Sequence, residues 1–210
     1  MTGIRGPRLL LASMVAAALG GCGGGSRMTF FVTSTPVADG GNIGGLAAAD
    51  AHCQTLAQAA GAGSHAWRAY LSAEGSAGQP AVHARDRIGR GPWFNAQGLQ
   101  IAAGVEDLHG PGNRIGGRTS LDEHGAFISS GAHDILTGSN GDGTLAPGDT
   151  TCRNWTSTDG HAIVGHSNKV GSIGGERVRS WNSAHLSDGC SIAALRKLGG
   201  GGLFYCFAAE

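Results

Sequence analysis

Four cysteines behind an export-type leader are the feature that most constrains the fold of this chain. Residues 1–21 hold two arginines and then an apolar run from Leu9 to Leu19. A run of this length is typical of a signal peptide and is too short to span a bilayer. Exported proteins meet oxidising conditions, in which cysteines tend to pair. The four cysteines that follow the leader region are Cys53, Cys152, Cys190 and Cys206.

A fifth cysteine, Cys22, ends the leader directly after Gly20 and Gly21. Small residues before a single cysteine resemble a bacterial lipobox, in which the cysteine is acylated and becomes the first mature residue. The alternative is an ordinary secretory signal with an incidental cysteine. Residues 22–27 are rich in glycine and predict a flexible tether. The sequence therefore predicts a bacterial cell-envelope protein, lipid-anchored, with the outer membrane as the favoured location, or secreted.

Charge and composition limit the classes of partner that this protein is expected to bind. Of the 15 basic residues two lie in the leader, which leaves 13 against 15 acidic residues and a net charge of −2. This balance gives no basic surface of the kind that binds nucleic acid. We expect the acyl group to be the only membrane contact. The 39 glycines and the 14% of charged residues predict many turns, and the 40% of apolar residues suffices for a core.

Apolar periodicity predicts one α+β domain over residues 28–210. Helical spacing of apolar and small residues is found from Leu46 to Ala60, and a second, short helix is expected over 81–88. From Gly91 to Gly131 the pattern indicates loops. We expect strands at 28–34, 67–72, 134–139, 151–157, 161–167 and 202–208, with a turn-rich hairpin over 140–149.

The order of these segments resembles a known family. "GGNIGGLAAADAHCQTLAQAAGAGSHAWRAYLS", "ILTGSNGDG…TCRNWTS" and "GC…LFYCFA" are similar to stretches of endostatin-like domains and of bacterial lectin or unknown-function domains with the C-type-lectin-like fold. The resemblance covers residues 28–210 and implies two nested disulfides, Cys53–Cys206 around Cys152–Cys190. A zinc site is the alternative for these cysteines, but a Cys-x-x-Cys pair to start one is missing. A nucleophilic cysteine would have to stay reduced after export.

The same resemblance implies a binding module that is not an enzyme, with an extracellular or periplasmic glycan or protein as its ligand. Residue type and loop position suggest Trp155, Trp181, Asn182 and His185 as contacts. The alternative is that Trp181 fills the core or lines a groove and that Trp155 packs against the inner disulfide. Sugar-binding lectins of this fold use Ca²⁺ with Glu-Pro-Asn or Gln-Pro-Asp and Trp-Asn-Asp. Both proline tripeptides are missing here, and Ser183 replaces the last aspartate, so we expect no calcium-dependent sugar site.

The competing interpretation is an exported metal-dependent hydrolase built on loop histidines. His133 and Asp134 could meet His166 or His185 after folding, with Asp188 as a further carboxylate. A His-Glu-x-x-His motif is missing, and so are the N-terminal histidines that hold zinc in endostatin. Asn140–Gly143 is more typical of a hairpin turn than of a calcium loop. We therefore expect no catalytic residue, no cofactor and no bound Zn²⁺ or Ca²⁺. A third interpretation is a purely structural envelope protein.

Overall fold

The computed structural model describes residues 1–3, 27–76, 78–169 and 179–210. Most of the predicted leader, Cys22 and nearly all of the tether lie outside these residues. None of the described helices has the length and apolar character needed to cross a bilayer.

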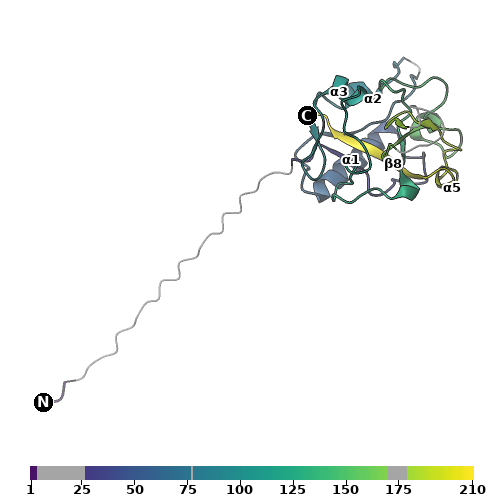
Figure 1. Ribbon diagram of the computed structural model, residues 1–210. Helices are drawn as coiled ribbons and strands as arrows, with labels where there is room; N and C mark the ends of the chain where they lie inside the picture. The colour runs from purple at the N-terminus through teal and green to yellow at the C-terminus, as the bar shows by residue number, and fades with distance from the viewer. Residues whose placement is uncertain (4–26, 77, 170–178) are drawn as a thin grey trace.

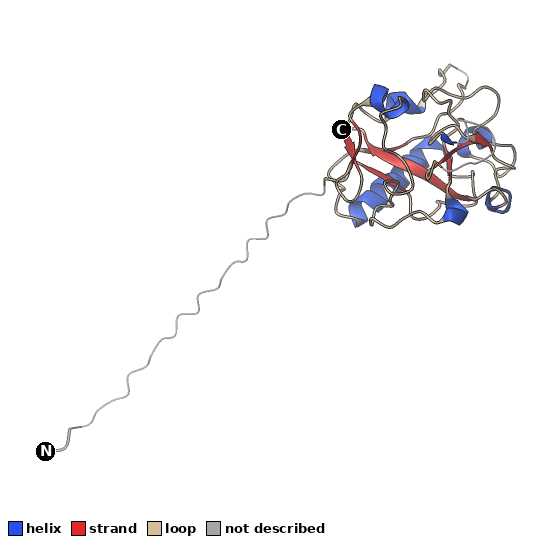
Figure 2. Ribbon diagram, viewed as in Figure 1, coloured by secondary structure: helices blue, strands red, loops and turns tan. Residues whose placement is uncertain are grey.

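Short elements alternate with long loops along the chain (Figures 1 and 2). The helices are α1 (Gly45–Ala59), α2 (Ala84–Arg87), α3 (Val105–His109), α4 (Cys152–Trp155) and α5 (Ile192–Arg196), with a 3₁₀ turn η1 (Ser130–Ala132). The strands are β1 (Phe30–Val32), β2 (Trp67–Ala69), β3 (Trp93–Phe94), β4 (Gln100–Ala102), β5 (Asp134–Leu136), β6 (Ile163–His166), β7 (His185–Leu186) and β8 (Gly200–Ala208). This is an α+β fold, as the sequence predicts.

The last strand, β8, organises the main sheet. The strand order is β1-β8-β5-β6-β7, and β2 also pairs with β8. All of these pairs are antiparallel except β5 with β8, which is parallel. Figure 1 shows β8 crossing the middle of the domain close to α1. The N-terminal and C-terminal parts of the domain are therefore joined in one sheet.

Two hydrophobic cores lie on the two faces of β8. Phe204 and Cys206 belong to the core that contains the buried residues of α1, including Cys53. Tyr205 and Phe207 belong to the second core, which contains several aromatic side chains. Because successive side chains of a strand point to opposite faces, the predicted alternation along the last strand separates the two cores.

Both expected disulfides are present. Cys53 of α1 bonds to Cys206 of β8, with 5.6 Å between the Cα atoms. Cys152 of α4 bonds to Cys190, with 5.7 Å between the Cα atoms. The first bond fixes the long helix to the central strand, and the second fixes α4 to the loop that precedes α5.

The predicted strand at 151–157 is wrong. Residues Cys152 to Trp155 form a single turn with left-handed backbone angles, with φ between 51° and 65°. Such angles are costly for residues other than glycine, so tertiary contacts must hold them. The Trp155 indole donates to the carbonyl of Ser72 at 2.8 Å, and the Trp155 carbonyl accepts from Ile43 and Gly44. Strand β5 pairs with β6 instead of with this segment.

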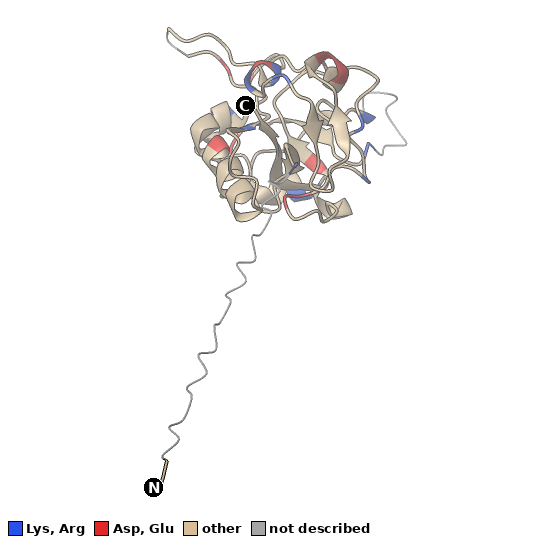
Figure 3. Ribbon diagram, turned by 90° about the vertical axis from the view of Figure 1, so that its left-hand side faces the viewer, with Lys and Arg blue, Asp and Glu red and all other residues tan. Residues whose placement is uncertain are grey.

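The stretch from Gly91 to Gly131 is also more regular than expected. It contains the β3–β4 hairpin and the helix α3, and Trp93 and Leu108 from these elements are buried in the second core. The strands have only two and three residues, which is too short for a clear period in the sequence. The charged residues drawn in Figure 3 are spread over several elements, among them α1, α2 and α3.

Candidate metal centre

A buried carboxylate lies at the edge where β5, β6 and β7 begin or end. Asp134 is the first residue of β5 and is 3% exposed. In the antiparallel β5–β6 pair it stands directly opposite His166, the last residue of β6. Directly opposed residues of such a pair have their Cβ atoms close together on one face. The register of the two strands therefore brings this acid and this imidazole together.

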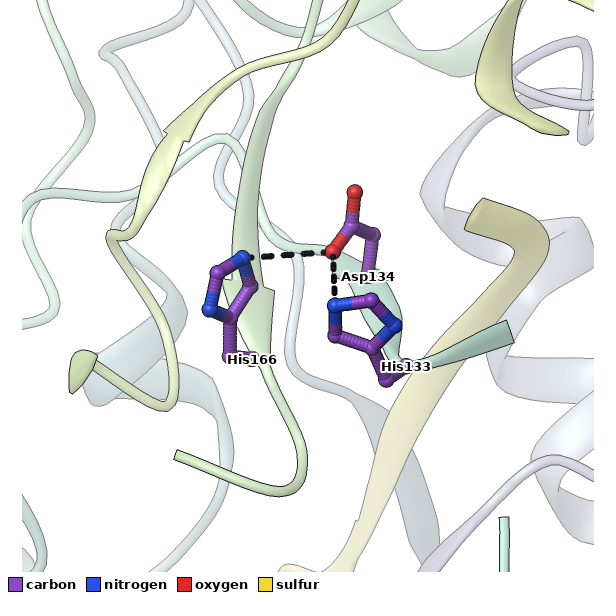
Figure 4. A group of neighbouring side chains, drawn as sticks. All are labelled: His133, Asp134 and His166. Carbon is purple, nitrogen blue, oxygen red and sulfur yellow. Dashed lines mark ion pairs between the residues drawn. The ribbon is translucent and has the colours of Figure 1, made fainter. Parts of the chain in front are cut away.

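Three imidazoles surround the Asp134 carboxylate. The Nε2 atoms of His133 and His166 lie 3.2 Å and 3.3 Å from its Oδ1 atom. The Nε2 atom of His185, from β7, lies 3.4 Å from its Oδ2 atom. Figure 4 shows the first two rings converging on one carboxylate oxygen while the second oxygen points away from them.

Backbone carbonyls set the orientation of two of these rings. The Nδ1 atom of His133 lies 2.6 Å from the carbonyl oxygen of Ser130, and that of His185 lies 2.9 Å from the carbonyl oxygen of Leu186. A carbonyl can only accept, so Nδ1 carries the proton in both rings. In a neutral His133 ring this leaves a lone pair on Nε2, directed at Asp134, whereas His185 can donate from Nε2 to Oδ2 only when its ring carries both protons.

Gly199 makes room for the His133 ring. Its φ of +98° lies in the left-handed region, and a Cβ atom at this position would lie 2.6 Å from Cε1 of His133. The Gly199 carbonyl also accepts a hydrogen bond from the backbone nitrogen of Asp134 at 3.0 Å. Glycine is therefore required here by both the backbone angle and the close approach.

The electrostatics of the cluster favour an ionised Asp134. Burial alone would raise the pKa of Asp134, but the close contacts with His166 and His185 and the charge of His133 outweigh it and lower this pKa. The hydrogen bond to Asp134 raises the pKa of His185 against the opposing effect of burial. Among the described residues, the buried Oδ1 atom of Asp134 nevertheless has no hydrogen-bond partner of normal geometry. An unpartnered buried carboxylate oxygen is costly.

The geometry suits a metal ion. The ligand atoms of His133, Asp134 and His166 all lie within 4.8 Å of one another. Zinc binds imidazole nitrogen and carboxylate oxygen at about 2.0–2.1 Å, so two ligands of a tetrahedral ion are about 3.3 Å apart. The distances from Oδ1 to the two Nε2 atoms, 3.2 Å and 3.3 Å, match this separation. Two imidazoles and one carboxylate are also a common ligand set for transition metals.

The structure separates the four ligand contacts that the sequence suggests. Trp155 is fully buried in the core that contains Cys152 and Cys190. Trp181 is 3% exposed and packs against the Tyr70 ring at a centroid distance of 4.7 Å. Asn182 is 1% exposed and donates to the Tyr70 hydroxyl at 2.9 Å. Of the four, only His185 belongs to the cluster around Asp134.

Two other acidic residues, Asp188 and Asp142 of the segment Asn140–Gly143, lie in different environments. The Asp142 carboxylate accepts hydrogen bonds from the nitrogen and the hydroxyl of Thr144, which closes the turn after Asn140. Asp188 lies 2.7 Å from the Lys197 ammonium in an exposed ion pair. These contacts fit a turn and a surface pair, respectively.

Comparison with known proteins adds nothing to this geometry. No protein-family model matches the chain, and no significantly similar curated protein is found.

Proposed function

We propose that this chain is a non-enzymatic binding module of the bacterial envelope whose ligand is one divalent transition-metal ion. The ion is held by His133 Nε2, His166 Nε2 and Asp134 Oδ1. The observation that carries the proposal is the buried Oδ1 atom, which two imidazole nitrogens face at 3.2 Å and 3.3 Å without a normal hydrogen bond. The C-type-lectin-like fold and the lipid anchor at Cys22 belong to the same proposal.

A metal ion satisfies this cluster better than protons do. For His133 and His166 each to donate from Nε2, both rings would need to carry a proton there. Since Nδ1 of His133 and Nδ1 of His185 are each already bonded to a carbonyl, each of these rings would be a cation if it also donated from Nε2. Several imidazolium groups around a single carboxylate repel one another. One divalent ion instead accepts the Nε2 lone pairs directly, and the bond between His133 Nδ1 and the Ser130 carbonyl becomes the usual outer support of a metal-binding histidine.

The donor set selects the class of metal. Two imidazole nitrogens and one carboxylate oxygen suit Zn²⁺ and its first-row neighbours. Calcium and magnesium prefer oxygen ligands throughout, so neither fits this centre. The sequence-based expectation is that neither Zn²⁺ nor Ca²⁺ is bound. The proposal replaces this expectation for zinc and keeps it for calcium.

The test is the binding of Zn²⁺ to the purified, chelator-treated protein, measured by titration calorimetry. We expect one equivalent to bind. The variant His166→Gln should lose this binding, because it removes a ligand from the centre. The matched control is His65→Gln. His65 contacts Glu210 beyond the far end of β8, whereas Asp134 pairs with Gly200 at the start of that strand.

Either of two results would contradict the proposal. The native protein could fail to bind Zn²⁺, or His166→Gln could bind it as tightly as His65→Gln does. Circular dichroism of both variants would verify that the fold is retained, and Asp134→Asn gives a second variant of the centre if His166→Gln is poorly folded.

The location in the envelope has its own prediction. The two disulfides support an oxidising compartment. Replacement Cys22→Ser should move the protein from the membrane fraction to the soluble envelope fraction, because the acyl chain is the proposed hold on the bilayer. Fractionation of cells with a high-salt wash measures this, with Ser26→Ala as the control that stays membrane-bound. A Cys22→Ser protein that remains in the washed membranes would be incompatible with the anchor.

A further inference from the structure

The next question is whether the protein fills the whole coordination sphere of the ion. The inference rests on the proposed metal binding and concerns the fourth ligand. A structural zinc site has four protein ligands, whereas a reactive site has three and leaves one position for an outside molecule. The only other imidazole described at the cluster is that of His185, so its role decides between the two.

His185 faces the wrong carboxylate oxygen to be a ligand of the same ion. Its Nε2 atom lies 3.4 Å from Oδ2, while the rings of His133 and His166 lie against Oδ1. The group of ligand atoms within 4.8 Å of one another contains His133, Asp134 and His166 and does not include His185. The lone pairs of two carboxylate oxygens point in different directions. His185 is therefore placed to hold Oδ2 and to orient the carboxylate.

The centre lies at the surface on the side of two of its imidazoles. The side chains of Asp134 and His166 are 3% and 8% exposed. Those of His133 and His185 are 22% and 29% exposed. The rings of His133 and His185 therefore form the exposed side of the cluster, and the side chains of Asp134 and His166 form its buried side.

We propose that the bound ion keeps one coordination position open to solvent and takes there a small anion with an oxygen or nitrogen donor atom, such as the carboxylate of an outside molecule. His185 acts as a positioning residue and not as a metal ligand. The module then binds its metal and, through the metal, a second ligand. A closed structural zinc site has no such capacity.

The experiment uses the full mature protein loaded with Co²⁺, whose visible absorption reports its coordination. Azide and acetate are titrated in turn, with chloride at the same ionic strength as the control. We expect a saturable spectral change with one anion bound for each Co²⁺. The variant His185→Gln can still donate to Oδ2, so it should bind Co²⁺ within about tenfold of the native affinity and keep the response to azide.

The possible results separate this inference from the proposed function. If Co²⁺ and Zn²⁺ do not bind at all, the metal proposal itself fails. If Co²⁺ binds and neither azide nor acetate changes its spectrum, the open position is refuted while metal binding stands. X-ray absorption of the zinc-loaded protein gives an independent measure: two imidazoles and an additional oxygen donor from outside the protein are expected, and three imidazoles would overturn the role of His185.

Discussion

Replacing Cys53 and Cys206 together by alanine should lower the free energy of unfolding by about 2–5 kcal/mol. The bond joins α1 to β8 across 153 residues, and chain entropy assigns about 5 kcal/mol to a loop of this length. The same cysteines lie in the core between the long helix and the central strand, so two residues that seal this interface are affected at once.

Urea unfolding of the oxidised proteins measures this effect, with linear extrapolation to water. The comparison is the double variant Cys152→Ala/Cys190→Ala. The loop of 38 residues that this disulfide closes gives a smaller chain-entropy contribution, about 4 kcal/mol. We expect the loss of this second disulfide to loosen mainly the residues between its two cysteines. Equal unfolding midpoints for the native protein and the Cys53/Cys206 variant would show that this bond does not stabilise the fold.

Zinc should stabilise the native protein against heat, and Asp134→Asn should abolish most of this effect. A ligand at 100 times its dissociation constant stabilises the folded state by about 2.7 kcal/mol. For a domain of this size that is a rise of about 5–10 °C in Tm. Asparagine keeps the shape of Asp134 but removes the charge and the second oxygen, so the amide is a poor replacement for the Oδ1 ligand.

Differential scanning calorimetry with and without Zn²⁺ measures the zinc-dependent rise in Tm for the native protein and for Asp134→Asn. The control is Asp188→Asn, which removes an equal charge from an exposed ion pair outside the centre. Its zinc-dependent rise should equal that of the native protein. A rise of native size in Asp134→Asn would place the stabilising ion elsewhere on the protein.

The parts of the fold that the sequence predicts well have strong local patterns. The helical spacing around Cys53 predicts α1 to within one residue at each end, and the alternation of Leu203 to Phe207 predicts β8. The disulfide pairs follow from the resemblance and are confirmed. The C-type-lectin-like assignment itself stays a prediction.

The parts that the sequence predicts poorly depend on tertiary contacts. The residues around Arg153 have the composition of a strand, but contacts of Trp155 hold them in a left-handed turn. Trp155 and Trp181 pack in the cores, as the alternative interpretation has it. An aromatic side chain that packs beside a disulfide or against other rings buries more apolar surface than one in an exposed loop.

The centre illustrates the same limit. The sequence names His133, Asp134, His166 and His185 as residues that could meet, but only the register of β5 with β6 and of β6 with β7 makes them converge. Such a register links positions far apart in the chain and leaves no local motif. A His-Asp dipeptide at the start of the expected strand 134–139 and a histidine near the end of the expected strand 161–167 are the only sequence signal for it.

The most direct test of the account is nuclear magnetic resonance of the histidine rings, with long-range ¹H–¹⁵N correlation spectra recorded before and after addition of Zn²⁺. The account predicts that Nε2 of His133 and His166 takes the chemical shift of a metal-bound nitrogen, that Nδ1 of His133 stays protonated, and that His65 does not change. Unchanged Nε2 signals for His133 and His166 at saturating Zn²⁺, or a metal-bound shift at histidines outside the centre alone, would contradict it.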